Sequence, residues 1–240
     1  MKNRLIFLLL LFCSLSSSAQ SFLAVRGTGE VIIQDRALHE DFQAIHASNG
    51  LNVYVTAGDT ARLEVEADEN LHEIIVTKVS NGTLKITTNK NIGRSTKKNV
   101  YVTYTKLNSL HANAGADIES TNLLKAQELN LICNSGGEIE VEVLSEYINA
   151  SASSGGDIEL EGKSINIDAD ASSGGEVDAA NLKVLHADAK ASSGGSVKVY
   201  AKESLKAKAT SGGKVEYYGA PKETEIQAGY SGRIKKRTNS

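Results

Sequence analysis

Acidic side chains recur in pairs, two residues apart, through the middle of the 240-residue chain. Most of these acidic pairs follow a short run of serine and glycine, as in SSGGDIE, where the pair is Asp157 and Glu159. The four pairs are Asp117 and Glu119, Glu138 and Glu140, Asp157 and Glu159, and Glu176 and Asp178. Carboxylate oxygens are the ligands that Ca²⁺ prefers, so stacked pairs of this kind would form a candidate calcium-binding ladder.

The alternative for these pairs is a solvated acidic face. Residues 114–180 hold 14 acidic and 2 basic side chains, and stacked like charges repel by about 1 kcal/mol even in water. Such a face discourages lateral aggregation. The calcium-binding repeat Gly-Gly-x-Gly-x-Asp is absent from the sequence. Calcium is therefore one candidate ligand, and no other cofactor is expected.

Catalytic chemistry finds little support in the sequence. No nucleophile motif is present, and the histidines are scattered without ligand-like spacing. They are His39, His46, His72, His111 and His186. Only Tyr200 and Tyr218 look like exposed aromatic platforms of the kind that sugar-binding sites use. We therefore predict no catalytic residues and a non-enzymatic protein.

The acidic pairs belong to a repeat of about 20 residues. The serine before each glycine pair falls at positions 135, 154, 173, 193 and 211, in steps of 19, 19, 20 and 18. Apolar residues alternate with polar ones on both sides of it. A period near 20 with strand-type alternation is typical of a solenoid. The sequence therefore predicts an all-β protein, a single-stranded parallel β-helix with about 20 residues per rung.

In-register stacking, about 4.8 Å per rung, converts repeat positions into columns. The alternation predicts that the serines and second glycines face inward at a corner, where stacked serines hydrogen-bond one another. These corner residues are Ser135, Gly137, Ser154, Gly156, Ser173, Gly175, Ser193, Gly195, Ser211 and Gly213. Two further inward columns are expected to be Leu131, Ile148, Ile167, Ala187 and Ala207, and Cys133, Ala150, Ala169, Ala189 and Ala209. A phosphate-binding loop is not expected, because no helix follows the glycines to supply N-terminal amides and no glycine pair is followed by the Lys-Ser or Lys-Thr that ends such loops.

The first 19 residues have the features of a signal peptide. Lys2 and Arg4 precede an apolar run over residues 5–12 that is too short to span a bilayer, and Ala19 ends a run of small residues. A short uncleaved anchor is the alternative. We expect an exported protein, in the periplasm, on the cell surface or outside the cell, with no transmembrane segment after cleavage.

Residues 20–240 are expected to form one domain. Residues 25–110 are less regular and are interpreted as N-terminal rungs with longer insertions that cap the stack, while residues 111–236 carry the regular repeats. Removing Lys2 and Arg4 from 26 basic residues leaves 24 against 29 acidic ones, a net charge of −5. This balance excludes nucleic acid as a partner. Cys133 is the only cysteine after residue 19, so no intrachain disulfide is expected.

Several motifs together resemble one bacterial family. They include VRGTGEVIIQDRAL, FQAIHASNGLNVYVTAGD, VEADENL, YVTYTKLNSLHANAGADIES and the SSGGDIE-type repeats. The sequence is similar to the putative auto-transporter adhesin, head GIN domain family of secreted Bacteroidota proteins, with Gly50-Leu51-Asn52 at the namesake tripeptide. The resemblance implies a right-handed parallel β-helix and supplies no established activity and no catalytic residues.

These observations lead to one functional prediction with two alternatives. We predict an exported, non-enzymatic, adhesin-like module that binds an unknown glycan or protein through an outer sheet face, the acidic columns first. A polysaccharide-active β-helix enzyme would instead show carboxylates clustered beside Arg or Lys in a groove. A structural solenoid would self-associate into a homo-oligomer, with a mass that depends on concentration.

Overall fold

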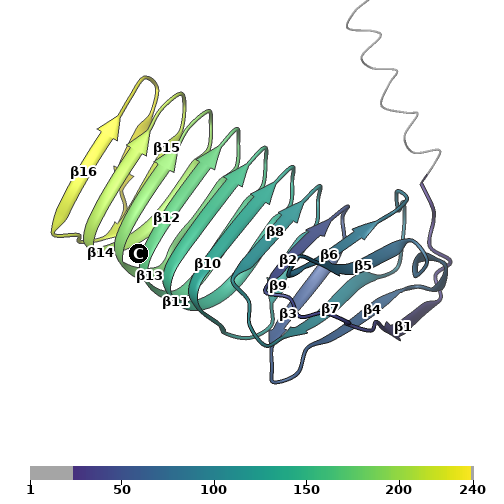
Figure 1. The fold of residues 1–240 in the computed structure, drawn as a ribbon. Helices are drawn as coiled ribbons and strands as arrows, with labels where there is room; N and C mark the ends of the chain where they lie inside the picture. Colours follow the sequence, from purple (N-terminus) through teal and green to yellow (C-terminus); the bar gives the residue numbers. More distant parts are fainter. Residues whose placement is uncertain (1–23, 239–240) are drawn as a thin grey trace, which may run out of the picture.

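The computed structural model describes residues 24–238 and is built almost entirely of β-strands. The strands wind into a solenoid of about seven turns, visible as a row of stacked rungs in Figure 1. This confirms the predicted all-β parallel β-helix. The predicted signal peptide, residues 1–19, lies outside the described residues. Within residues 24–238 no helix is long and apolar enough to cross a membrane.

The described part of the chain forms 17 strands and one short 3₁₀ helix. In order they are β1 (Val31–Asp35), β2 (Ala44–Ser48), β3 (Asn52–Ala57), β4 (Arg62–Asp68), η3 (Glu69–Leu71), β5 (Ile75–Ser80), β6 (Thr83–Thr88), β7 (Lys98–Tyr104), β8 (Ser109–Asn113), β9 (Asp117–Ser120), β10 (Leu124–Asn134), β11 (Glu138–Ser153), β12 (Asp157–Ser172), β13 (Glu176–Ala191), β14 (Ser196–Ala209), β15 (Lys214–Gly219), β16 (Glu223–Ala228) and β17 (Arg233–Lys236).

Each central rung is one long strand that bends in the middle and ends in a tight turn. β11, β12 and β13 have 16 residues each, and each pairs in parallel with the next rung. We call the segments that lead into the tight turns wall 1, for example residues 147–153. The segments that leave the turns, for example residues 157–163, are wall 2. Inward side chains of both walls share one core, so their outer faces point away from each other.

The tight turns require a left-handed backbone. In the copy at Ser172, Ser173 has φ 49° and Gly174 has φ 76°, and the Gly175 amide donates to the Ser172 carbonyl at 2.8 Å. Positive φ at both central residues is the type I′ pattern, which reverses a chain in two residues. Glycine adopts this conformation without steric cost, which explains the first glycine of each pair.

The second glycine is required for a different reason. A Cβ atom on Gly175 would lie 2.5 Å from the carbonyl carbon and oxygen of Ala152 in the preceding rung. At Gly156 and Gly213 the nearest backbone oxygen of the preceding rung would be only 2.4 and 2.2 Å away. Wall 2 therefore starts in direct contact with the backbone of the rung before it, and no side chain fits between them.

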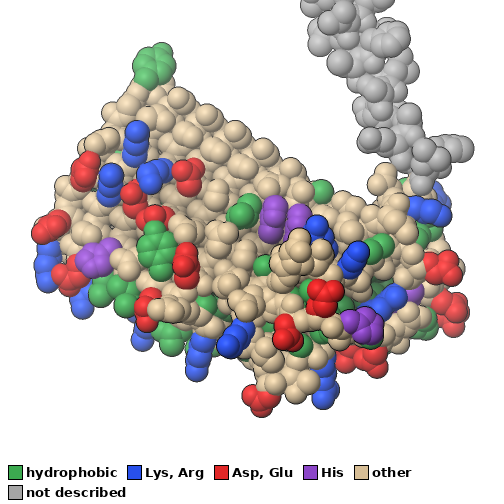
Figure 2. Space-filling view, viewed as in Figure 1, with side chains coloured by type: hydrophobic (Ala, Val, Ile, Leu, Met, Phe, Trp, Pro, Cys, Tyr) green, Lys and Arg blue, Asp and Glu red, His purple; other side chains and the backbone are tan. Residues whose placement is uncertain are grey.

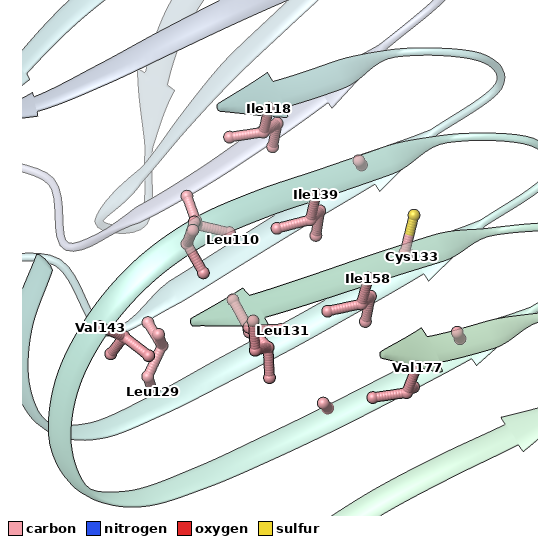
Figure 3. Close-up of a cluster of buried hydrophobic side chains, with 14 of the residues drawn as sticks. Leu110, Ile118, Leu129, Leu131, Cys133, Ile139, Val143, Ile158 and Val177 are labelled. Atoms are coloured by element: carbon pink, nitrogen blue, oxygen red, sulfur yellow. The ribbon is translucent and has the colours of Figure 1, made fainter. Parts of the chain in front are cut away.

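The interior widens away from the turns. Beside the turn the buried residues are small, with Gly156 on one wall and Ala152 on the other, whereas Leu160 and Ile148 fill the deeper positions. Figure 3 shows the same gradient, with Cys133 toward the turns and Leu129 near the bend. Each rung is therefore a wedge with its narrow end at the glycines.

The repeat serines do not face inward, contrary to the sequence-based expectation. Ser135, Ser154, Ser173, Ser193 and Ser211 are all exposed, whereas the second glycines are buried. Each turn adds two residues between the strands, which is an even number, so the inward residues before and after it keep the same odd or even positions in the sequence. The serines therefore look like part of the inward alternation although they lie outside it. Stacked serines do hydrogen-bond, but at the opposite bend, where Ser145 Oγ donates to the buried Ser164 Oγ at 3.1 Å.

Two predicted inward columns were wrong by two residues at some rungs. The register pairs Ile148 with Leu129, and Ala150 with Leu131. At the other end it places Ala187 beside Leu205. The steps from residue 129 to 148, 167, 187 and 205 are 19, 19, 20 and 18, the same as the steps between the turns, because each rung shifts together with its turn. The predicted inward position of Cys133 is confirmed, and burial raises the pKa of its thiol to about 12.

The first third is not a simple series of rungs. β2 lies between β6 and β8, and β3 lies between β7 and β9, so the rung of β6 and β7 sits outside the rung that precedes it in sequence. Antiparallel strands cover the outer edge of the stack. β5 pairs with β6, β4 pairs with β7, and β1 pairs with β4. The expected turn at Ser80–Gly82 joins β5 and β6. Within residues 24–238 no comparable strand covers β16 and β17 at the other end.

A buried carboxylate fastens this N-terminal cap. Asp68, at the end of β4, accepts backbone hydrogen bonds from Gly29 at 2.6 Å, Thr96 at 2.8 Å and Lys97 at 3.1 Å. Burial opposes the ionised form, but these amides outweigh it and lower the pKa of Asp68. One side chain thus joins two loops that are far apart in the sequence.

The two glycines of a turn predict different responses to an added methyl group. Gly175→Ala places a Cβ against backbone that cannot move aside, and we expect it to reduce the free energy of unfolding by about 3 kcal/mol. Gly174→Ala meets no atom within 4 Å and only strains φ, at a cost of about 1–2 kcal/mol. Chemical denaturation of the two variants measures the difference.

The matched control is Ser173→Asn in the same turn. Asparagine tolerates the left-handed conformation better than serine, so the free energy of unfolding should be unchanged or higher. A Gly175→Ala variant no less stable than Gly174→Ala would contradict the close approach between rungs.

Candidate functional site

The eight predicted acidic residues lie together on the outer face of wall 2. One column contains Asp117, Glu138, Asp157 and Glu176, and the next contains Glu119, Glu140, Glu159 and Asp178. Their strands pair in register, so carboxylates repeat at the spacing of the rungs, about 4.8 Å. Basic residues enter both columns toward the C-terminus: Ser196, Lys214 and Arg233 continue the first, and Lys198, the buried Glu216 and Lys235 continue the second.

Among residues 24–238, ion pairs form at only one end of the acidic columns. Lys198 Nζ lies 2.9 Å from Glu176 and 2.6 Å from Asp178. Among the described residues the other six carboxylates form no ion pair. Desolvation and then the neighbouring carboxylates raise the pKa values of Asp157 and Glu159. The middle of wall 2 therefore carries negative charge that lacks a partner.

The unneutralised end of the columns contains a hollow of about 230 Å³. We call it the acidic hollow, and its polar lining is Asn52, Tyr54, Asp117, Glu119, Glu138 and Glu140. The ring of Tyr54 stacks on that of Tyr101 at 5.2 Å, and the Tyr101 hydroxyl donates to Glu66 at 2.8 Å. The hollow thus combines carboxylates with an aromatic side chain whose position is fixed.

The calcium-ladder arrangement requires side chains that converge. Among the described residues no group of three or more His, Cys, Asp or Glu side chains is placed to hold a metal ion. Side chains of one column leave their strands in parallel, which keeps the carboxylates side by side and does not gather them around one point. Calcium binding therefore stays a prediction.

Wall 1 carries a second concavity that the sequence did not indicate. A hollow of about 490 Å³ lies on its outer face across five rungs, from β11 to β16. Its lining includes Tyr147, Asp168, His186, Asp188, Ser204 and Lys206. We call it the wall 1 groove. Figure 2 shows this side of the molecule, where charged side chains of both signs and a histidine gather over the C-terminal rungs.

The structure corrects two expectations about aromatic and imidazole groups. His46 and His111 are not scattered: β2 and β8 pair them, and their rings stack at 4.1 Å. Burial, followed by the charge of Lys85, lowers the pKa of His46. Tyr200 and Tyr218, expected to be exposed, are half-buried on adjacent rungs. The tyrosines that line concave polar sites are Tyr54 in the acidic hollow and Tyr147 in the wall 1 groove.

Comparison with protein families identifies the chain. Residues 41–221 match the model described as "Putative auto-transporter adhesin, head GIN domain". The chain belongs to this family. The match spans most of the solenoid and the rung of β2 and β3, and it confirms the resemblance seen in the sequence. Among curated proteins, none matches the chain.

Solved structures share the fold of this head GIN domain protein. A putative adhesin from Bacteroides fragilis superimposes with a TM-score of 0.82 at 21% identity, covering 89% of this chain and 100% of that one. A putative lipid binding protein from Parabacteroides distasonis has a TM-score of 0.68 at 21% identity, covering 89% and 99%. A putative adhesin from Parabacteroides merdae has a TM-score of 0.67 at 21% identity, covering 91% and 100%. At these identities the likeness establishes the architecture.

The raised carboxylate pKa values predict a distinctive pH dependence. Between the unfolded and folded pKa values the native protein binds more protons than the unfolded chain, so ionisation of Asp157 and Glu159 destabilises it as the pH rises. The double variant Asp157→Asn, Glu159→Gln should therefore be more stable than the wild type at about pH 7, by at most about 1 kcal/mol because solvent screens these exposed charges. This difference should shrink toward zero by about pH 4. Urea denaturation at several pH values measures it.

A control with the same change in charge is Asp41→Asn, Asp59→Asn, at two exposed positions outside the columns. It should leave the stability within about 0.5 kcal/mol of the wild type. Equal gains from both double variants would show that net charge, and not stacking, causes the effect.

Proposed function

We propose that this protein is an exported, non-enzymatic, adhesin-like binding module whose acidic face on wall 2 receives a basic partner. The observation that carries the proposal is the acidic hollow, where in-register carboxylates meet an aromatic ring and, among the described residues, form no ion pair, Lys98 acting on Asp117 only at longer range. Membership of a family described as adhesins supports a binding role. Export rests on the leader expected at residues 1–19.

The chemistry of the acidic hollow favours a cationic group. A lysine or arginine side chain that enters it would meet carboxylates from two rungs, Asp117 and Glu138 in one column and Glu119 and Glu140 in the other. The ring of Tyr54 adds a surface for a cation–π contact. Relief of the repulsion between stacked carboxylates would contribute to binding. Anionic partners are disfavoured for the same reason.

The test is calorimetric titration of the protein with octalysine at low salt. Binding is expected to weaken steeply as salt is raised, because screening acts on exposed charges. The variant Glu140→Gln, Glu159→Gln removes two carboxylates from the middle of the second column and should reduce the affinity at least about tenfold. The Asp41→Asn, Asp59→Asn variant changes the net charge equally and should bind like the wild type.

Three other results would contradict the proposal. Equal affinity of both double variants for octalysine would mean that binding reflects net charge alone. A response to Ca²⁺ that exceeds the effect of NaCl at matched ionic strength, together with no octalysine binding, would identify the columns as a metal ladder instead. A mass that rises with protein concentration would favour the structural, self-associating alternative.

A further inference from the structure

The wall 1 groove is elongated along the solenoid axis. Its lining comes from equivalent positions of successive rungs, because the register pairs Tyr147 with Asn166, then His186, Ser204 and Glu223. Five rungs at about 4.8 Å per step give a length of about 19 Å. A site of this shape suits a linear polymer that lies across the strands better than a compact metabolite.

Hydrogen bonds within the groove hold its side chains in place. The Tyr147 hydroxyl donates to Asp168 at 2.5 Å, and this bond together with burial raises the pKa of Tyr147 to about 12. His186 Nδ1 and Ser204 Oγ lie 2.8 Å apart on neighbouring rungs. The phenol therefore stays protonated in neutral solution, and the site is preorganised for hydrogen bonding.

The groove is less acidic than the acidic hollow, because its lining sets Lys206 against four carboxylates, those of Asp168, Asp188, Glu223 and Glu225. Lys190 Nζ lies 3.3 Å from Asp188, and Lys206 stands between Asp188 and Glu225 in one column. The remaining carboxylates disfavour an anionic polymer, and the nearby lysines weaken the attraction for a cationic one. A neutral ligand rich in hydroxyl groups fits this alternation of donors and acceptors.

Two further features favour a sugar chain. The Oδ1 atom of Asp188 is buried and accepts no hydrogen bond from the described residues. A ligand hydroxyl would satisfy it once this partly exposed carboxylate turns toward the groove. Ile165 and Leu185, which precede Asn166 and His186 in the chain, are 43% and 37% exposed. They supply an apolar margin for the C–H faces of sugar rings.

We propose that the wall 1 groove binds a linear, neutral oligosaccharide along the solenoid axis. This site goes beyond the proposed function, because it lies on the opposite wall and uses different residues. The protein would then engage a basic partner on wall 2 and a glycan on wall 1.

Four neutral hexasaccharides serve as probes: β-1,4-linked glucose, mannose and xylose, and α-1,4-linked glucose. We expect at least one to bind the protein in calorimetry with a Kd below about 1 mM. The variant Tyr147→Phe, Asp188→Asn removes a hydroxyl and a carboxylate but keeps side-chain size, and should weaken binding at least about tenfold. The sugar should be recovered intact, which separates binding from hydrolysis.

Two controls keep the test specific. Asp170→Asn alters an exposed carboxylate on the same face outside the groove and should bind the sugar like the wild type. The wall 2 variant Glu140→Gln, Glu159→Gln should also bind it normally, so failure of this proposal is distinguishable from failure of the proposed function. The proposal is overturned if none of the four sugars binds at about 5 mM, if the groove variant binds equally well, or if octalysine occupies the groove instead.

Discussion

The close approach of each second glycine to the backbone of the preceding rung is the constraint on which the rest of the structure depends. Where Gly175 meets Ala152, no side chain separates one rung from the next, so the turns set the spacing and register of the whole stack. The walls can diverge only from this narrow edge. Small residues line it, and larger ones such as Ile148 fill the wider part of the wedge. The low aromatic content of the chain, 5%, follows from this geometry, because a wedge between two close walls has little room for aromatic rings.

Register gives the two outer faces their chemical character. A side chain that recurs in the sequence becomes a column on the surface, so repeated acidic residues such as Glu140 and Glu159 concentrate charge on wall 2. On wall 1 the sequence varies from rung to rung, and the same stacking places tyrosine, aspartate, histidine and lysine side by side. A regular scaffold thus carries a uniform surface and a varied one back to back, and varied surfaces are where specific recognition is expected.

The repeat made the fold predictable, and local features made the rest hard to see. A period near 20 residues with alternation was sufficient to predict the β-helix and to bring the eight acidic residues into one face. Alternation could not show that Ser173 points outward, because a turn of two residues leaves the odd-even pattern of inward residues unchanged on both sides. The wall 1 groove was missed because Tyr147 and His186 are different residue types 39 positions apart, with no motif to link them. Nor could the sequence show that β6 and β7 stack outside β2 and β3, or that Asp68 joins the loop before β1 to the loop between β6 and β7. The steps between the turns are also the steps between the inward residues of successive rungs, so they predict the observed register of the inward columns.

The separation of the two faces is the central claim, and amide NMR of the folded protein tests it most directly. Octalysine and the tightest-binding hexasaccharide would be added one at a time, and then together. The account predicts that octalysine shifts amides around the acidic hollow on β3, β9 and β11, that the sugar shifts those of wall 1 from β11 to β16, and that each binds equally well when the other is present. Overlapping shifts, or competition between the two ligands, would contradict it and indicate a single binding surface.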